Sequence, residues 1–248
     1  STVNPVVGEC NDGYLNDIQG RHVSAEHVHA ALAAAASGPV AEGAVGAGTG
    51  TTCYGWKGGI GTASRVTPAA QGGFTLGALV QTNFGRAEDL RFGGVALGQV
   101  LRPPQPPLPE RGSVMVVLAT DAPLDARQLH RLCVRAGAGL ARTGTTVSHG
   151  SGDFAIAFST TRRIAHEGGE TAMPVTHVAA LANEGVVLDG LFLAVVEAVE
   201  EAVLNSLCAA ETTTGRDGHV RVGIPVDEVG QMLRRTVVRG EAGRIVDG

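Results

Sequence analysis

The 248-residue sequence predicts a mixed α and β fold in which helices cover sheets. Short runs of strand-forming residues alternate with segments of helical periodicity, which favours layered packing of both element types. The alternation lacks the regular strand–helix–strand rhythm of a doubly wound parallel sheet. Hydrophobic residues make up 44% of the chain and aromatic residues only 4%, so aliphatic side chains and alanine must fill the core.

The first half of the chain contains one predicted helix and one predicted strand. The helix is expected to begin at the N-cap residue Ser24, to run to about Ala36 and to end at Gly38-Pro39. A glycine-rich stretch follows over residues 43–61. Residues 74–83 are rich in strand-forming side chains and predict a strand.

A proline-rich loop precedes a strand near the middle of the chain. The segment from Arg102 to Gly112 contains five prolines. Proline lacks an amide proton, so this segment is predicted to be an exposed, extended loop. The apolar run that follows, Ser113–Thr120, predicts a buried strand.

The second half contains three predicted helices and one strand. Asp125 is the expected N-cap of a helix, and residues 154–160 are expected to form a second buried strand. The longest helix is expected to begin at Asp189 and to run to about Ala210. A short helix is expected over residues 227–237. The side chains predicted to face inward are Leu129, Leu132, Cys133, Ala136 and Leu140 on the first of these helices, and Val195, Val196, Val199, Val203, Leu207 and Cys208 on the longest.

Composition excludes several classes of function. The net charge of −5 without a basic cluster argues against a nucleic-acid partner, and no apolar run approaches the roughly 18 residues of a membrane span. The eight histidines form no metal-binding pattern, so no metal is expected. The cysteines lie far apart and are interpreted as free thiols, which favours a cytoplasmic location with a periplasmic one left open. They are Cys10, Cys53, Cys133 and Cys208.

Three familiar motifs are almost matched. The stretch from Gly50 to Lys57 resembles a phosphate-binding loop, but Trp56 separates the second glycine from the lysine. Residues 46–50 form a weak dinucleotide fingerprint, and His149 occupies the first glycine position of a G-x-S-x-G pattern around Ser151. Packing or turn roles are the better interpretation of all three.

Cleavage of the bond between Gly112 and Ser113 would create a catalytic group. If this bond were broken, Ser113 would carry both a hydroxyl and a free α-amine at the edge of a sheet. An α-amine titrates near 7.7–8.0, so it can act as the general base for its own hydroxyl. The cleavage itself can proceed by attack of the Ser113 hydroxyl on the Gly112 carbonyl. The alternative is a loop that simply leads into a strand beginning with serine.

Several segments resemble the L-aminopeptidase/D-esterase (DmpA-type) family, which includes β-peptidyl aminopeptidases. The resemblance is collinear over most of residues 5–205. The segments around the processing site are residues 109–121 and Ser151-Gly152-Asp153, continued by Ile156-Ala157-Phe158-Ser159-Thr160. The others are Pro5-Val6-Val7-Gly8-Glu9, Asp12-Gly13, Leu15-Asn16-Asp17-Ile18, Gly38-Pro39-Val40, Glu42-Gly43, Gly48-Thr49-Gly50, Gly55, Lys57-Gly58-Gly59, Gly61-Thr62-Ala63-Ser64-Arg65, Val80-Gln81, Asn83 and Gly85.

The resemblance implies an α+β fold, a four-layer α/β/β/α sandwich of the N-terminal-nucleophile-hydrolase-like (DmpA/ornithine acetyltransferase) type. It implies a single catalytic domain over residues 1–248 that cleaves itself into residues 1–112 and 113–248, which stay associated, and a homotetramer. The implied activity is hydrolysis of N-terminal residues (L, D or β) from short peptides, amides or esters without a cofactor.

The resemblance also assigns roles to individual residues. Ser113 would be the nucleophile, and its liberated amine the base. Asn83 would donate to the oxyanion, and Ser151 and Asp153 would hold the amine. Glu9 would face the ammonium group of the substrate. Taken singly, Asn83, the 151–153 turn and Glu9 could equally be ordinary surface or turn residues.

Two departures from the family pattern leave alternatives open. Some members have a tyrosine two residues after the acid, where this chain has Asn11. Either Asn11 or Tyr14 could supply the second oxyanion donor. The family also carries a segment before Pro5 that this chain lacks, and the sequence has no initiator methionine, so the natural product is expected to begin upstream.

Two other functions are compatible with this architecture. One is a biosynthetic amidase or acyltransferase with a pantetheine-type amide substrate. The other is a non-catalytic assembly protein, which would remain an uncut chain.

Overall fold

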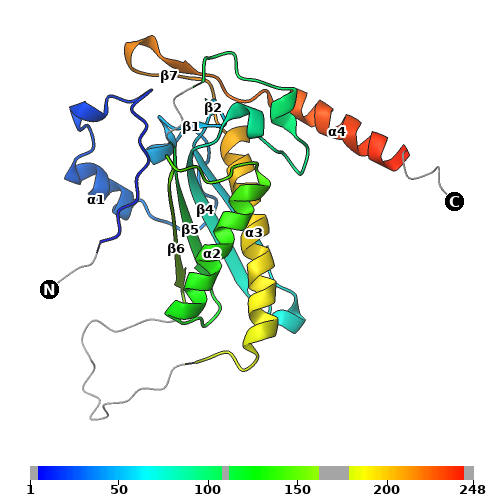
Figure 1. Ribbon diagram of the computed structural model, residues 1–248. Coiled ribbons are helices and arrows are strands. Elements are labelled where there is room, and N and C mark those ends of the chain that lie inside the picture. Colours follow the sequence, from blue (N-terminus) through cyan, green and yellow to red (C-terminus); the bar gives the residue numbers. More distant parts are fainter. Residues whose placement is uncertain (1–4, 108–111, 162–178, 243–248) are drawn as a thin grey trace.

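The central feature of the computed structural model is a four-stranded sheet in the order β3-β4-β5-β6 (Figure 1). The structure describes residues 5–107, 112–161 and 179–242. The strands are β3 (Ile60–Val66), β4 (Thr75–Asn83), β5 (Ser113–Thr120) and β6 (Gly152–Ser159). The first three pair antiparallel, and β6 runs parallel to β5. The predicted strands at 74–83 and 113–120 are therefore confirmed.

One face of the sheet is covered by two helices. Side chains alternate along β5, and Val114, Val116 and Leu118 are buried against α2 (Ala126–Arg142) and α3 (Glu184–Cys208). Alternation places successive side chains on opposite faces, so this burial pattern marks a sheet covered on one side. The helical partners in the core include Leu132 and Leu140 of α2, and Val195, Val199, Val203 and Leu207 of α3.

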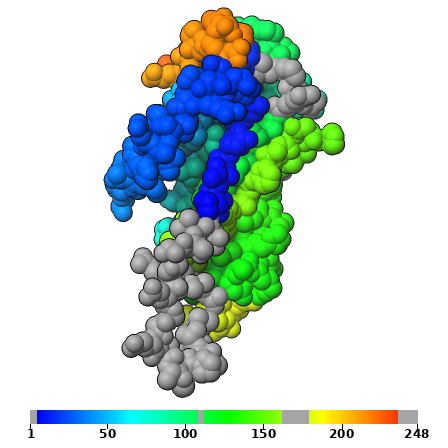
Figure 2. Space-filling view, turned by 90° about the vertical axis from the view of Figure 1, so that its left-hand side faces the viewer, coloured from blue at the N-terminus to red at the C-terminus, as the bar shows by residue number. Residues whose placement is uncertain are grey.

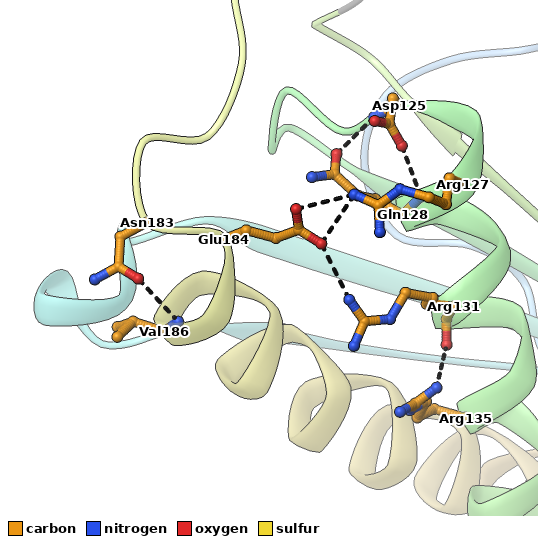
Figure 3. Close-up of polar contacts among 8 residues, drawn as sticks. All are labelled: Asp125, Arg127, Gln128, Arg131, Arg135, Asn183, Glu184 and Val186. Atoms are coloured by element: carbon orange, nitrogen blue, oxygen red, sulfur yellow. Dashed lines mark hydrogen bonds and ion pairs between the residues drawn. The ribbon is translucent and has the colours of Figure 1, made fainter.

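The longest helix begins five residues earlier than the sequence predicts, at Glu184 rather than at Asp189. The side chain of Asn183 accepts from the Val186 amide at 3.5 Å, so Asn183 is the N-cap. Glu184 in turn binds Arg127 at 2.9 Å and Arg131 at 3.1 Å, both on α2 (Figure 3). The ion pairs join the first turn of α3 to α2, a contact between segments far apart in the sequence.

The strand β6 is exposed, contrary to the prediction of a buried strand. Phe154 is 65% and Phe158 is 46% exposed. Among the described residues β6 pairs only with β5, so it forms an edge of the sheet. Both phenylalanines lie on the face away from α2, because they are register partners of Met115 and Ala119. An apolar run alone does not distinguish an edge strand from a buried one.

The predicted caps of the other helices are observed. Ser24 is the N-cap of α1 (Ala25–Ala33), and its backbone amide donates to the His27 ring at 3.0 Å. This helix ends at Ala33, earlier than the predicted Ala36, and none of its residues is buried. Asp125 caps α2 and accepts from the Gln128 amide at 2.8 Å. The last helix, α4 (Val226–Ala242), covers the range expected for the C-terminal helix and extends beyond it.

The remaining elements are short, and all except η3, which connects β3 to β4 at the other end, gather at one end of the main sheet (Figure 1). Two two-stranded ribbons are formed by β1 (Thr52–Cys53) with β2 (Trp56–Lys57), and by β7 (Thr213–Thr214) with β8 (Val220–Arg221). The 3₁₀ helices are η1 (Ile18–Gly20), η2 (Gly46–Gly48), η3 (Ala69–Gln71), η4 (Ala87–Asp89), η5 (Leu97–Gln99) and η6 (Arg216–Gly218). No helix in the described part of the chain is both long and apolar enough to cross a membrane.

The second face of the sheet carries the N-terminal segment. Gly8 lies so close to Met115 of β5 that a Cβ at residue 8 would be 2.4 Å from the methionine methyl group. In Figure 2 this dark-blue segment runs through the middle of the view. Of the four layers expected, the described residues form the main sheet and the α2/α3 layer.

Candidate active site

Ser113 is the first residue of β5 and lies between the ends of two neighbouring strands. Its register partners are Asn83, the last residue of β4, and Gly152, the first residue of β6. Because β4 is antiparallel and β6 parallel to β5, these three residues lie together where the ends of the three strands meet. The topology thus brings together residues that are far apart in the sequence.

The side-chain amide of Asn83 is held by contacts on both of its polar atoms. Its Nδ2 donates to the backbone oxygen of Asn11 at 2.9 Å and lies 3.5 Å from the Ser113 hydroxyl. Its Oδ1 accepts from the Thr52 amide of β1 at 3.1 Å. These contacts orient the amide so that its donor side faces Ser113.

The carbonyl of Gly112 accepts a hydrogen bond from the backbone amide of Gly152 at 2.9 Å. The carbonyl that precedes Ser113 is therefore polarised by a fixed donor. Next to it, the Ser151 hydroxyl donates to the Asp153 carboxylate at 2.6 Å. The sequence singled out the 151–153 turn but not the Gly152 amide, because that contact depends on the parallel pairing of β5 with β6.

Cys10 is an unanticipated neighbour of Ser113. Its thiol is buried and donates to the Gln81 carbonyl at 3.7 Å, and the neighbouring Ser113 side chain influences its pKa. Burial raises the pKa of Cys10, and the negative charges of Glu9 and Asp153 add to the rise. Both carboxylates consequently lie near the Ser113 end of β5. The sequence offered no signal for this contact beyond the position of Cys10 next to Glu9.

Asn11 and Tyr14, the two candidates for the second oxyanion donor, make side-chain contacts with other groups. The side-chain oxygen of Asn11 accepts from the Gly13 amide at 3.0 Å, and only its backbone reaches Asn83. The Tyr14 ring stacks on His219, with centroids 4.5 Å apart, and lies beneath the Arg221 guanidinium at 4.4 Å. The Gly152 amide is therefore better placed beside the Gly112 carbonyl than either side chain.

A cavity of about 300 Å³ opens beside the junction. Its wall includes Asn83, Gly112 and Ser151. Two ion pairs lie on its charged side, Arg86 with Asp89 at 3.1 Å and Arg102 with Glu88 at 3.4 Å. Within the described residues no group of three or more His, Cys, Asp or Glu side chains is arranged to hold a metal ion. The site therefore presents a hydroxyl, amide donors and carboxylates next to a small cavity, which are groups suited to acyl transfer.

A model of peptidase family S58 matches residues 1–221. The chain belongs to this family. It is 43% identical over 247 residues to the β-peptidyl aminopeptidase BapA of Sphingosinicella microcystinivorans, and the match covers 93% of this chain and 61% of that protein. Membership of family S58 and the relatives' names confirm the resemblance identified from the motifs.

Solved structures of similar proteins share the fold. The PH0078 protein from Pyrococcus horikoshii is 50% identical with a TM-score of 0.84, over 95% of this chain and 64% of that one. The L-aminopeptidase D-Ala-esterase/amidase from Ochrobactrum anthropi, described as a variant of the Ntn hydrolase fold, is 42% identical with a TM-score of 0.78, over 91% of this chain and 61% of that one. The S58 chain therefore has a mixed α/β fold related to N-terminal-nucleophile hydrolases and spans about three fifths of its relatives' length.

Proposed function

We propose that this chain is the core of a self-processing N-terminal-serine aminopeptidase. It cleaves its own Gly112–Ser113 bond and then uses Ser113 to remove N-terminal residues from short peptides, amides or esters. The observation that supports this most directly is the contact set at the junction. The Ser113 hydroxyl lies beside the Asn83 amide, and the Gly112 carbonyl accepts from the Gly152 amide.

Self-cleavage begins with attack of the Ser113 hydroxyl oxygen on the Gly112 carbonyl carbon. The bond from that carbon to the Ser113 nitrogen breaks, an ester forms, and the nitrogen takes up the hydroxyl proton. Water then hydrolyses the ester and leaves a carboxylate on Gly112. The Gly152 amide stabilises the negative charge that develops on the carbonyl oxygen.

In the processed protein, the α-amine of Ser113 is the general base. The Ser151–Asp153 pair supports this role, because a carboxylate and a hydroxyl adjoin the start of β5. Asn83 is the oxyanion donor, and Glu9 binds the ammonium group of the substrate. The cavity beside Gly112 fits a short peptide or amide rather than a folded protein.

The names of the relatives support the substrate class. One is a β-peptidyl aminopeptidase, and another is an L-aminopeptidase with D-Ala-esterase and amidase activity. The chain covers only 61% of the length of each. The activity, the division into residues 1–112 and 113–248 and the homotetramer are accordingly part of the proposal.

The test is the intact mass under denaturing conditions, together with an assay on β- and α-peptide amides. Wild-type protein should give two fragments that meet at the Gly112–Ser113 bond. Ser113→Ala should give one uncut, inactive chain, whereas Ser64→Ala, at an exposed serine of β3, should be cut like wild type. An uncut wild-type chain that hydrolyses the amides would contradict the mechanism, and an uncut, inactive wild-type chain would favour an assembly protein.

A further inference from the structure

Lys57 is the only lysine among the 19 lysine and arginine residues of the sequence. It lies at the end of β2 and is fully buried. A buried charge loses its hydration, so it is retained only where other groups compensate for that loss. A packing role, which the sequence favoured for the stretch from Gly50 to Lys57, does not explain why a charged side chain stands there.

The ammonium group of Lys57 is bound by three backbone carbonyls. Its Nζ donates to the carbonyl oxygens of Gly48 at 2.8 Å, Thr51 at 3.0 Å and Gly58 at 2.6 Å. An ammonium has three N–H donors, so these contacts use all of them. The planar fork of a guanidinium does not match three acceptors around one nitrogen. The carbonyl set therefore explains why this position has a lysine in a chain whose other basic residues are arginines.

One of the three carbonyls connects Lys57 to the proposed oxyanion donor. The Thr51 carbonyl and the Thr52 amide belong to the same peptide unit, and in a trans peptide they point in opposite directions. Lys57 binds the carbonyl at 3.0 Å, and the amide donates to Oδ1 of Asn83 at 3.1 Å. A continuous chain of hydrogen bonds thus runs from the ammonium through the 51–52 peptide to the Asn83 side chain.

The other end of the Asn83 side chain faces the proposed nucleophile. Its Nδ2 donates to the Asn11 carbonyl at 2.9 Å and lies 3.5 Å from the Ser113 hydroxyl. Hydrogen bonds in a chain polarise one another, so a stronger bond to Oδ1 makes the N–H groups of the same amide stronger donors. The positive charge of Lys57 therefore favours a negative charge that develops beside Ser113.

We propose that Lys57 positions and polarises Asn83 through the 51–52 peptide, and so strengthens the hydrogen bond from Asn83 to the oxyanion. The inference rests on the proposed function, because the oxyanion forms when Ser113 attacks a substrate. Each donor keeps its own proton throughout, so Lys57 contributes orientation and charge but transfers nothing. It acts through Asn83 and is therefore a positioning residue.

The charge of Lys57 can be changed by pH as well as by mutation. Burial lowers the pKa of Lys57 to about 8 from an ordinary value of 10.5, while the negative charges of Asp12 and of an ionised Cys53 favour the protonated form. Asp12 follows Asn11 in the sequence, and its carboxylate packs against Gly50. A titration near pH 8 should consequently remove the polarisation of Asn83 without any substitution at residue 57.

The first measurement is a titration by nuclear magnetic resonance of the uncut Ser113→Ala chain, labelled in lysine and asparagine. The single lysine signal should titrate near pH 8, and the side-chain amide signal of Asn83 should shift with the same midpoint. Asn205 is the internal control, because it donates to the Thr62 carbonyl, away from Lys57. An Asn83 signal that stays constant while Lys57 titrates would overturn the proposal.

The second measurement is a double-mutant cycle on kcat. Lys57→Met should lower kcat by about ten- to a hundredfold with little change in KM, because it weakens an interaction made in the transition state. The double variant Lys57→Met/Asn83→Ala should be no slower than Asn83→Ala alone, since Lys57 acts through Asn83. Losses that multiply in the double variant would assign Lys57 an independent role and overturn the proposal.

The pH profile of kcat separates polarisation from a loss of structure. Wild-type kcat should decline above about pH 8 as Lys57 loses its proton, and this decline should be absent from Lys57→Met. Gly61→Ala is the matched control, because a side chain there would collide with the Ala202 carbonyl and destabilise the fold away from Asn83. It should keep the wild-type profile. The same alkaline decline in Lys57→Met would contradict the assignment.

The measurements also distinguish failure of the inference from failure of the proposed function. The first one requires neither cleavage nor activity, and its decisive comparison requires no substitution of Lys57. It therefore tests the contact between Lys57 and Asn83 even if Lys57→Met does not fold. An uncut, inactive wild-type chain would overturn the proposed function and, with it, the catalytic role of Lys57. An active wild-type protein whose Asn83 signal ignores Lys57 would overturn the inference alone.

Discussion

The residue before the proposed nucleophile has to be small. A Cβ on Gly112 would lie 3.0 Å from the Asn83 carbonyl oxygen and 3.1 Å from the Phe84 Cα. Both are backbone atoms, which cannot move aside as a flexible side chain can. The sequence placed this glycine at the border between a loop and a strand. Its steric reason became visible only with the register of β4 and β5.

Gly112→Ala should slow self-cleavage by roughly ten- to a hundredfold. The added methyl group displaces the Gly112 carbonyl from the Ser113 hydroxyl, and a shift of about 1 Å can reduce a rate a hundredfold. The measurement is the time course of the intact mass. Gly77→Ala in β4 is the matched control, because its Cβ would meet nothing nearer than 4.0 Å. Equal cleavage rates in the two variants would contradict the close-approach argument.

Asn83→Ala should reduce turnover by about 10²–10³-fold, the effect of one lost oxyanion donor. It also removes the acceptor for the Thr52 amide, so a stability loss of about 1 kcal/mol is expected. Asn205→Ala is the matched control. It removes a hydrogen bond of 2.9 Å from a partly buried asparagine to the Thr62 carbonyl, away from Ser113. Similar losses of turnover in both variants would point to a purely structural role for Asn83.

At the scale of elements, β5 creates the site through its two different neighbours. The sequence predicted β4, β5 and β6 individually, but not that β5 lies between the other two. That order brings Asn83 and the 151–153 turn to the same end of β5. The start of α3 was missed for a similar reason, since Asn183 and Asp189 are both good cap residues. In the structure Asn183 is the N-cap, and the ion pairs of Glu184 with α2 accompany this earlier start.

The contact between β3 and α3 depends on the absence of a side chain at Gly61. A Cβ there would lie 1.9 Å from the carbonyl oxygen of Ala202 in α3. Gly61→Ala should therefore lower the unfolding free energy by about 1–3 kcal/mol, as overpacking usually does. Chemical denaturation in the uncut Ser113→Ala background measures this unfolding free energy. Gly77→Ala is the control, because a Cβ at residue 77 would meet nothing nearer than 4.0 Å. An unchanged midpoint for Gly61→Ala would show that α3 can move away without loss.

At the scale of the whole molecule, motif order was more informative than hydrophobic pattern. The collinear segments identified the family, and the alternation of strands and helices predicted a mixed fold. The exposure of Phe154 and Phe158 was not predictable, because edge strands and central strands can have the same apolar pattern. The packing of Cys10 against Ser113 was equally hidden, since it joins two segments far apart in the sequence.

The pH dependence of stability should reflect the buried thiol of Cys53. Burial raises the pKa of Cys53 to about 12 from an ordinary value of 9.0. Between these values the unfolded chain binds fewer protons than the folded chain, so the unfolding free energy should fall as pH rises above about 9. Burial lowers the pKa of Lys57 to about 8, and this group contributes in the opposite direction between pH 8 and its ordinary 10.5.

Cys53→Ala removes the downward contribution of the thiol, so its unfolding free energy should change with a more positive slope between pH 8 and 10 than that of its parent. Urea denaturation in the uncut Ser113→Ala background keeps the covalent state constant across this range. Cys133→Ala removes a thiol that is only half-buried, and it should change the slope less. A Cys53→Ala slope equal to that of the parent would mean that the thiol gains solvent before the molecule unfolds, and that the β1–β2 ribbon next to Asn83 opens on its own.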